Sequence, residues 1–319
     1  MFRFAIMGAG HIANKFCDAV RRIDGAEVVT VASKTGRAKE FAEKNGIPEY
    51  FGDYSEMLEK VKPDCVYVAA TSNAHYELSK LCIEAGVPVL CEKAMFLNSA
   101  DAREVFALAE EKGVFAMEAM WSRFLPAVVK AREWIHSGRI GEPIYATSAI
   151  GFKAEENPNN RYYSKALGGG AAFDLTVYDY EILTFLIDRP ASVVSAHAVK
   201  ASDGVDLTDH ILLNFKKDGC RDCLAVCEST LLAKLDEKIV IFGSEGKLEL
   251  PRPHFATDCY LYNANFELID SFKDAVTENG FVYETEEVIR YVKAGKTQSE
   301  TIPHRLTIDC AGMFDELLA

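Results

Sequence analysis

Two glycines directly after the first apolar run of the chain are the first residues whose spacing suggests chemistry. Residues 3–7 are typical of a buried strand, and Gly8 and Gly10 follow them before a helical pattern begins. A tight turn at Gly8, with no Cβ at Gly10, would let a pyrophosphate approach the backbone. The helix beginning at His11 and Ile12 would direct its free N–H groups at the phosphates. We expect a dinucleotide site here, although two glycines also serve simple turn geometry.

A lysine and an aspartate–tyrosine pair form a second group, suited to proton transfer. Lys93 directly follows a buried apolar run, where the alternative to a functional role is a solvent-facing charge. Asp174 and Tyr178 are four residues apart in a helical pattern over 170–186 and would therefore share one face, although such a pair on its own is more often a surface acid and a core aromatic. A tyrosine acts as an acid or base near neutral pH only if its pKa falls from about 10, which an adjacent ammonium favours. Lys93 is the candidate ammonium.

Basic and hydroxyl side chains follow the second predicted strand, over residues 27–32. An NAD site usually has an acid here to accept from the ribose 2′-OH, whereas a basic residue accommodates a 2′-phosphate. This chain has Ser33, Lys34 and Arg37 instead. We therefore expect NADP, with NAD the less favoured cofactor; the alternative is that these charges belong to a solvated first helical turn.

Strand and helix patterns alternate through the first part of the chain. Apolar runs at 64–70, 88–91 and 114–117 alternate with helical patterns at 76–85 and 99–112. Right-handed crossovers would assemble them into a doubly wound parallel sheet, whose ligands lie beyond the carboxyl ends of the strands. Polar residues at those ends join the candidate cofactor site: Thr71, Asn73, His75, Glu92 and Lys93. For His75 the alternative is a structural histidine whose ring nitrogens are satisfied within the fold.

The pattern changes near residue 120. Strand-like runs then follow one another with few helices between, at 144–152, 191–199, 205–215, 223–231 and 239–242. This is typical of a mostly antiparallel sheet. We predict an α/β protein with a doubly wound, Rossmann-type parallel sheet over 1–120. Residues 121–319 are predicted to form an α+β domain with a large, mostly antiparallel open sheet.

Four ordered blocks resemble the Gfo/Idh/MocA oxidoreductase family: residues 8–13, 84–93, 118–124 and 168–178. The last two are most similar to its branch of dimeric dihydrodiol dehydrogenases, aldose (xylose) dehydrogenases and glucose-fructose oxidoreductase. A looser similarity continues through Gly280-Phe281-Val282-Tyr283-Glu284. The family's usual Glu-Lys-Pro reads Glu92-Lys93-Ala94 here. This departure leaves open whether the Lys93–Ala94 bond is cis and how the lysine is oriented.

The resemblance implies roles for the second group of residues. It places Lys93, Asp174 and Tyr178 around the nicotinamide C4, with Tyr178 as proton donor or acceptor, Lys93 tuning it, and Asp174 holding the lysine or a substrate hydroxyl. It also implies a homo-oligomer formed through the second domain's sheet. The residues expected on the substrate side, with core aromatics and a structural arginine as the alternative, are Trp121, Arg123, Phe152 and Arg161.

Composition narrows the partners and the compartment. The 319 residues carry a formal net charge of −13, which argues against a nucleic-acid partner. No apolar run approaches the length of a membrane span, and the nine cysteines suit a reducing, cytoplasmic location. Cys220, Cys223 and Cys227 resemble a metal spacing but lack a second Cys/His pair, so we expect no metal.

The resulting expectation is an NADP-dependent oxidoreductase that transfers hydride between the nicotinamide and a CH–OH or C=O carbon. Its expected small-molecule substrate is a sugar, polyol or trans-dihydrodiol. One alternative is a catalytically silent NAD(P)-sensing regulatory protein of the same fold, although the retained proton-transfer residues count against it. The other is an NAD-linked inositol-type dehydrogenase, which the basic residues after the second strand disfavour.

Overall fold

The computed structural model describes residues 1–157 and 160–319, and the chain divides into two compact units. Unit 1 comprises Met1–Trp121 and Glu278–Ala311, and unit 2 comprises Ser122–Thr277 and Gly312–Ala319. The predicted division at residue 120 places everything after it in the second domain, whereas residues 278–311 pack within unit 1. The reason is helix α8 (Phe281–Lys293), whose apolar face lies against helix α1 (His11–Arg21).

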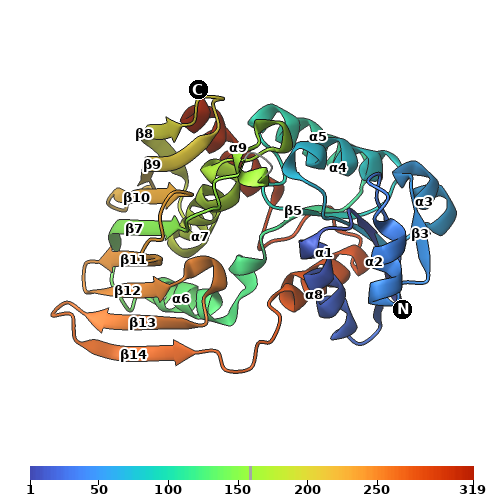
Figure 1. Ribbon diagram of the computed structural model, residues 1–319. Coiled ribbons are helices and arrows are strands. Elements are labelled where there is room, and N and C mark those ends of the chain that lie inside the picture. The colour runs from blue at the N-terminus through green and yellow to red at the C-terminus, as the bar shows by residue number, and fades with distance from the viewer. Residues whose placement is uncertain (158–159) are drawn as a thin grey trace. The chain divides into compact units, whose positions relative to one another are not determined.

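A six-stranded parallel sheet forms the centre of unit 1, in the order β3-β2-β1-β4-β5-β6 (Figure 1). The strands are β1 (Phe2–Met7), β2 (Ala26–Ala32), β3 (Glu49–Phe51), β4 (Cys65–Val68), β5 (Val89–Glu92) and β6 (Ala116–Ala119). Every residue of β4, β5 and β6 is buried, as parallel strands covered on both faces require. The predicted doubly wound parallel sheet is confirmed. Its strand order reverses between β1 and β4, the position at which such sheets bind ligands.

Helices connect these strands and begin at side-chain caps where the sequence supplies them. Asn98 accepts from the Asp101 amide at 2.9 Å to start α5, and Asp53 does the same for α3 through the Glu56 amide. The helices that follow the strands of this unit are α2 (Ala38–Asn45), α3 (Tyr54–Val61), α4 (His75–Glu84) and α5 (Ser99–Lys112). A last helix, α9 (His304–Leu318), continues into unit 2.

Unit 2 is built on an eight-stranded sheet in the order β14-β13-β12-β11-β7-β10-β9-β8. The neighbours β7 and β10 pair in parallel, and the other described neighbours pair antiparallel. The predicted large, mostly antiparallel sheet is therefore confirmed. The strands are β7 (Pro143–Gly151), β8 (Ala191–Lys200), β9 (Asp206–Phe215), β10 (Cys223–Thr230), β11 (Lys238–Gly243), β12 (Gly246–Pro251), β13 (Asp258–Asn263) and β14 (Leu268–Lys273).

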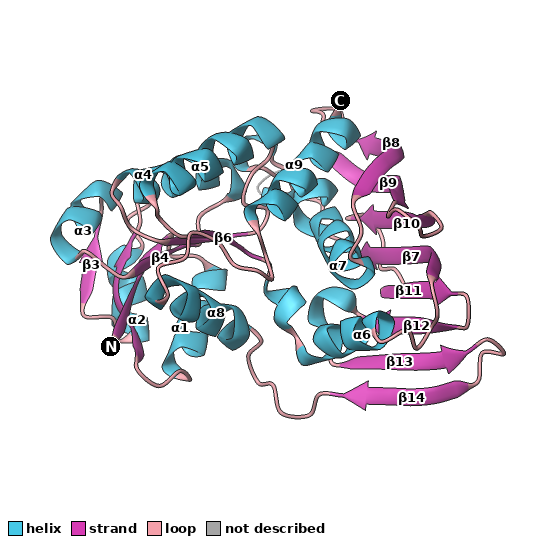
Figure 2. Ribbon diagram, turned by 180° about the vertical axis from the view of Figure 1, so that it is seen from behind, coloured by secondary structure: helices cyan, strands magenta, loops and turns pink. Residues whose placement is uncertain are grey.

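Two helices, α6 (Pro126–His136) and α7 (Val177–Ile187), lie on one side of this sheet (Figure 2). A buried ion pair helps to hold α7: Arg123 meets Glu181 at 2.7 Å, and both side chains are 0% exposed. The predicted helix over 170–186 differs from the structure at its start, where residues Ala172–Thr176 form a π-helical turn. Among the described residues, every helix falls short of the length and apolar character that crossing a bilayer requires.

Candidate functional site

The turn after β1 has the geometry that a phosphate-binding loop needs. Gly8 has φ +106°, and a Cβ on it would lie 2.7 Å from the carbonyl carbon of Ala69. Gly10 is the extended N-cap residue of α1 and has open space on its Cβ side, with the nearest atom 3.7 Å away. Because no side chain caps this helix, its first amides are available to an anion.

Replacing Gly8 with alanine should destabilise unit 1. The added methyl would collide with the backbone of Ala69, and the alanine would have to adopt the positive φ of this turn. We therefore expect the free energy of unfolding to fall by about 1–3 kcal/mol. Gly25→Ala is the matched control, because Gly25 also has a positive φ (+80°) but nothing lies within 4 Å of its Cβ position. Urea unfolding measures both; a Gly8→Ala protein as stable as the Gly25→Ala protein would contradict the close approach.

The predicted basic group lies together at the carboxyl end of β2. The Ser33 hydroxyl lies 2.9 Å from that of Thr35, which accepts a hydrogen bond from Arg37 Nε at 3.0 Å. The Lys34 ammonium sits over the Tyr54 ring, 5.4 Å from its centroid. Lys34, Thr35 and Arg37 are exposed and Ser33 is buried, so this loop offers two cations and the Thr35 hydroxyl to an anionic ligand.

The loop after β4 is held by its own polar residues. The Thr71 hydroxyl donates to Asn73 Oδ1 at 2.7 Å. His75 is 1% exposed, and its ring nitrogens lie 2.9 Å from the Ala94 carbonyl and 3.1 Å from the Ala70 carbonyl. Burial lowers its pKa. The predicted cofactor contact of His75 stays a prediction; the described contacts of its ring are with these two carbonyls.

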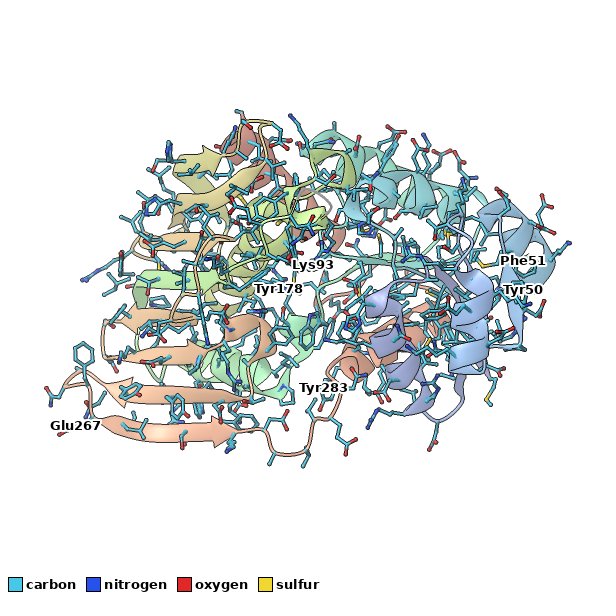
Figure 3. The ribbon with its side chains drawn as sticks, in the orientation of Figure 1. Tyr50, Phe51, Lys93, Tyr178, Glu267 and Tyr283 are labelled. Carbon is cyan, nitrogen blue, oxygen red and sulfur yellow. The ribbon has the colours of Figure 1, made fainter. Side chains whose placement is uncertain are left out.

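Lys93, labelled in Figure 3, directly follows β5. The peptide bond between Lys93 and Ala94 is cis. The neighbouring Glu92 is 7% exposed and accepts a hydrogen bond from the Tyr67 hydroxyl. Burial, followed by the charge of Glu92, raises the pKa of Tyr67 well above its ordinary value. These contacts hold the end of β5, which carries the lysine.

Asp174 and Tyr178 lie in the helical segment of unit 2, on the π-helical turn and in the first turn of α7. Arg161 donates to Asp174 at 2.9 Å, so the structure brings together a predicted catalytic residue and a predicted substrate residue. The Tyr178 ring is 7% exposed and lies 5.2 Å, centroid to centroid, from that of His254.

The other predicted substrate residues have different surroundings. In unit 1, Trp121 stacks on Phe281 with ring centroids 5.2 Å apart. In unit 2, Phe152 packs edge-on against Tyr162. Arg123 is fully buried in its pair with Glu181, which gives it a structural role in unit 2.

Sequence reasoning missed three buried polar groups. His254, beside Tyr178, is a lone histidine between strands and carries no pattern of its own. Glu284 on α8 is 0% exposed, and burial, followed by the charge of Glu92, raises its pKa well above the ordinary value. The sequence feature that could have pointed to Glu284 is its place in the block 280–284, which resembles the family loosely. The third group is the pair Asp206 and Asp209 on β9, both at most 2% exposed.

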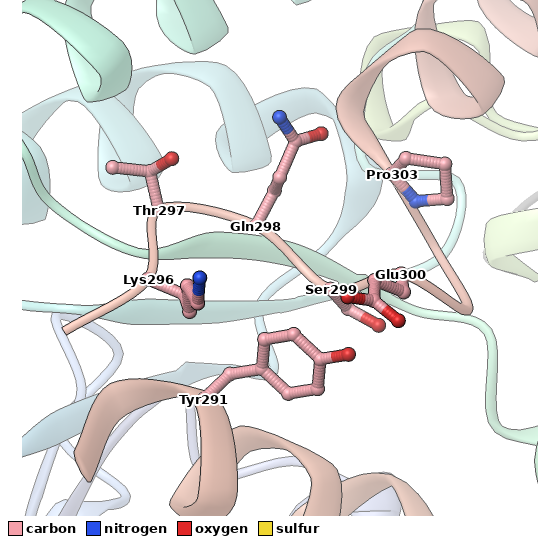
Figure 4. A pocket seen from close by; sticks show the side chains of 7 residues that line it. All are labelled: Tyr291, Lys296, Thr297, Gln298, Ser299, Glu300 and Pro303. Carbon is pink, nitrogen blue, oxygen red and sulfur yellow. The ribbon is translucent and has the colours of Figure 1, made fainter. Parts of the chain in front are cut away.

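A pocket of about 510 Å³ lies in unit 1, and the three groups just described are not among its lining residues (Figure 4). Its lining residues are Tyr291, Lys296, Thr297, Gln298, Ser299, Glu300 and Pro303. Across residues 1–157 and 160–319, no cluster of three or more His, Cys, Asp or Glu side chains could hold a metal ion. Cys220 is exposed, whereas Cys223 and Cys227 are buried in the sheet.

Comparisons with known proteins cover both units. The family model described as an oxidoreductase family with an NAD-binding Rossmann fold matches residues 2–120, and the GFO/IDH/MocA C-terminal domain model matches residues 128–249. Trans-1,2-dihydrobenzene-1,2-diol dehydrogenase of Danio rerio is 31% identical over 98% of this chain and 95% of its own length. D-xylose 1-dehydrogenase (NADP(+)) of Hypocrea jecorina is 29% identical over 99% of this chain and 91% of its own length.

Solved structures agree on the fold. A 3-ketoreductase from Actinomadura kijaniata, in complex with NADP and TDP-benzene, superposes with a TM-score of 0.87 at 23% identity, covering 98% of this chain and 96% of its own. An aldose-aldose oxidoreductase from Caulobacter crescentus, complexed with glycerol, also gives a TM-score of 0.87, at 18% identity over 99% and 96%.

Proposed function

Since this chain belongs to the Gfo/Idh/MocA family of oxidoreductases, we propose that it is an NADP-dependent dehydrogenase acting on CH–OH groups. It transfers hydride between nicotinamide C4 and a CH–OH or C=O carbon of a sugar, polyol or trans-dihydrodiol. The observation that carries this proposal is similarity along the whole chain. The match to a trans-dihydrodiol dehydrogenase covers 98% of it, through both compact units, and the match to an NADP-linked xylose dehydrogenase covers 99%.

The residues of unit 1 fit the cofactor. The turn at Gly8 and Gly10 leaves backbone room for a pyrophosphate, and the loop from Ser33 to Arg37 offers cations and the Thr35 hydroxyl to a 2′-phosphate. When bound, NADP supplies the hydride-accepting nicotinamide ring. The protein's own residues bind it, orient it and exclude water.

The roles of the catalytic residues are proposals. Tyr178 exchanges a proton with the substrate oxygen, and the Lys93 ammonium stabilises the phenolate form that this exchange requires. Asp174 holds the lysine or a substrate hydroxyl, and its ion pair with Arg161 supports an orienting role. Thr71, Asn73, His75, Glu92 and Lys93 are proposed as the remaining cofactor contacts, and Trp121, Phe152 and Arg161 as substrate contacts.

Replacing Arg37 with alanine should weaken NADP binding selectively. Loss of one charge-assisted hydrogen bond to the 2′-phosphate predicts a rise of about 10- to 100-fold in the Kd for NADP, with the Kd for NAD unchanged. Titration by intrinsic fluorescence measures both constants. Lys39→Ala is the control, because this exposed lysine near the start of α2 faces Glu43 at 3.9 Å. If the Kd values for NADP and NAD rise equally, Arg37 does not contact the 2′-phosphate, and the NAD-linked alternative gains support.

Turnover separates the enzyme from a regulatory sensor. The purified chain should reduce NADP with at least one member of a panel of aldoses, polyols and trans-dihydrodiols, and should oxidise NADPH with the corresponding carbonyl compound. Absorbance of the reduced nicotinamide follows both directions. Tight NADPH binding without turnover on any member of the panel would favour the sensor.

We also propose that a second copy of the chain covers the open face of the eight-stranded sheet. Tyr145, Leu224 and Phe242 are neighbours across strands on this face, and Tyr145 and Leu224 are each 39% exposed. Exposed apolar groups of this kind mark interfaces.

The oligomer can be tested by placing a charge on this face. We expect Leu224→Glu to shift the wild-type dimer or larger oligomer to a monomer in sedimentation velocity. Leu232→Glu is the control, because Leu232 is exposed to a similar degree, 43%, and follows β10 outside the sheet. A monomeric wild-type chain would contradict the proposal.

A cytoplasmic, reducing location is proposed from the cysteines. All nine are free thiols, and all except Cys220 are buried. Buried free thiols suit a compartment that keeps cysteine reduced.

A further inference from the structure

A pair of buried carboxyl groups on β9 lies against the start of the helix that carries Asp174 and Tyr178. Asp206 Oδ2 accepts a hydrogen bond from the Ala172 amide at 2.6 Å. Asp209 Oδ2 accepts one from the Thr176 hydroxyl at 2.7 Å. The two aspartates therefore form hydrogen bonds with the first and last residues of the π-helical turn, on either side of Asp174.

The carboxyl group of Asp206 lies close to the backbone at the start of the π-helical turn. Gly170, just before the turn, has φ +127°, and a Cβ on it would lie 2.2 Å from Asp206 Oδ1. A side chain at position 170 would therefore displace the carboxyl group. Because Gly170 has no side chain, Asp206 can reach the amide of Ala172, from which it is separated by 34 positions in the chain.

The two carboxyl groups are also coupled to each other. Asp206 is 2% exposed and Asp209 is 1% exposed. Burial raises the pKa of Asp209 to about 8, and the charge of Asp206 adds to this effect. Burial also raises the pKa of Asp206, opposed by its hydrogen bond to Ala172. Both shifts favour a proton on the pair, which reduces the repulsion between two buried carboxylates.

Asp206 and Asp209 bind only the start of the helix, because two other residues hold the rest of it. The body of α7 has its own anchors: Asp179 accepts hydrogen bonds from Ser148 and Ser229 of the sheet, and Glu181 pairs with Arg123. The π-helical turn is a local change of helical register, and such turns are frequent at functional sites.

We propose that Asp206 and Asp209 are positioning residues for the reaction, which set where the helix begins and thereby place Asp174 and Tyr178. Asp206 fixes the first amide of the π-helical turn, and Asp209 fixes its last residue through Thr176. This inference rests on the proposed roles of Asp174 and Tyr178. Neither aspartate touches the reacting atoms.

The test compares Asp206→Ala with Asp206→Asn, which keeps an oxygen acceptor for the Ala172 amide. We expect Asp206→Ala to lower kcat about 100-fold, the effect of misplacing a catalytic group by roughly 1 Å, while the Kd for NADPH stays within twofold of wild type. Asp206→Asn should restore kcat to within about fivefold of wild type, because the cap is retained.

Amide hydrogen exchange gives a readout that does not depend on turnover. In Asp206→Ala, the peptide covering 171–178 should lose about two- to thirtyfold of its protection, the range that losing a helix cap implies. Asp206→Asn should keep it. If the wild-type chain turns over no substrate, the proposed function fails, while hydrogen exchange still tests whether Asp206 sets the start of the helix.

Thr208→Val is the matched control. It removes a 2.7 Å hydrogen bond between Thr208 of β9 and Thr230 of β10 without touching the helix. Its kcat and the protection of 171–178 should stay within about twofold of wild type. The proposal is overturned if this control loses kcat as Asp206→Ala does, or if a folded Asp206→Ala keeps wild-type kcat or wild-type protection.

A second variant covers the case in which Asp206→Ala does not fold. Thr176→Val has nearly the same shape and removes only the hydroxyl, which bonds to Asp209 at 2.7 Å and lies 3.3 Å from the Ala171 carbonyl oxygen. We expect its kcat to fall at least about fivefold with NADPH binding unchanged. Wild-type kcat in Thr176→Val would then overturn the proposal.

Discussion

Replacing Tyr178 with phenylalanine is expected to lower kcat by about 10²- to 10⁴-fold, the usual contribution of a positioned acid or base. The phenyl ring keeps the packing of a side chain that is 7% exposed and lies beside His254, so the fold should be unaffected. The Kd for NADPH should also be unchanged, because the proposed cofactor-binding residues belong to unit 1. Steady-state kinetics and a fluorescence titration measure the two quantities.

Tyr163→Phe is the matched control for this change. Tyr163 lies in the same unit, and its hydroxyl makes a long hydrogen bond of 3.5 Å to the Ala154 carbonyl. We expect its kcat to stay within about twofold of wild type. The proton-transfer role would be refuted by a Tyr178→Phe enzyme that keeps wild-type kcat.

Replacing Lys93 with methionine is expected to have the second large effect. Methionine keeps much of the length and apolar character of the stem but removes the ammonium. Without this charge the phenolate of Tyr178 loses its stabilisation, and we expect kcat to fall about 10²- to 10³-fold. The pH profile of kcat should move to higher pH, because the tyrosine then needs a higher pH to lose its proton. Stopped-flow measurement of NADPH formation follows both effects.

A double variant tests whether the lysine acts through the tyrosine. If it does, the kcat of Lys93→Met/Tyr178→Phe should lie within about fivefold of the worse single variant, since residues that act as a unit are not additive. Lys112→Met, in the exposed last turn of α5, is the control for loss of a lysine charge. Fully multiplicative losses would show that Lys93 acts on something else.

Most of the fold could be predicted because the strands of unit 1 are continuous apolar runs and the helices between them have clear limits. The helix predicted over 99–112 has these bounds in the structure. The prediction missed β3, which has three residues, none of them buried. It also missed β12, β13 and β14, six-residue strands that mix apolar with charged and polar residues and contain no long apolar run.

The parts of the site that could not be predicted depend on residues far apart in the chain. The turn at Ala172–Thr176 is π-helical, and Asp206 and Asp209 of β9 hold its two ends. The burial of Arg123 depends on Glu181, and that of His75 on the carbonyl of Ala94. Spacing four apart, together with the family resemblance, predicted Asp174 and Tyr178 as site residues, but neither carried a sign of these partners.

Lys93 of unit 1 and Tyr178 of unit 2 are proposed to work together, with the lysine ammonium tuning the tyrosine that exchanges a proton with the substrate oxygen. A crystal structure of the chain with NADP and a bound polyol tests this most directly. We expect Tyr178 Oη within about 3.2 Å of the oxygen on the carbon next to nicotinamide C4, and Lys93 Nζ within about 6 Å of Tyr178 Oη. A complex in which Tyr178 points away from that oxygen, or Lys93 away from the tyrosine hydroxyl, with the carbon still beside C4, would contradict it.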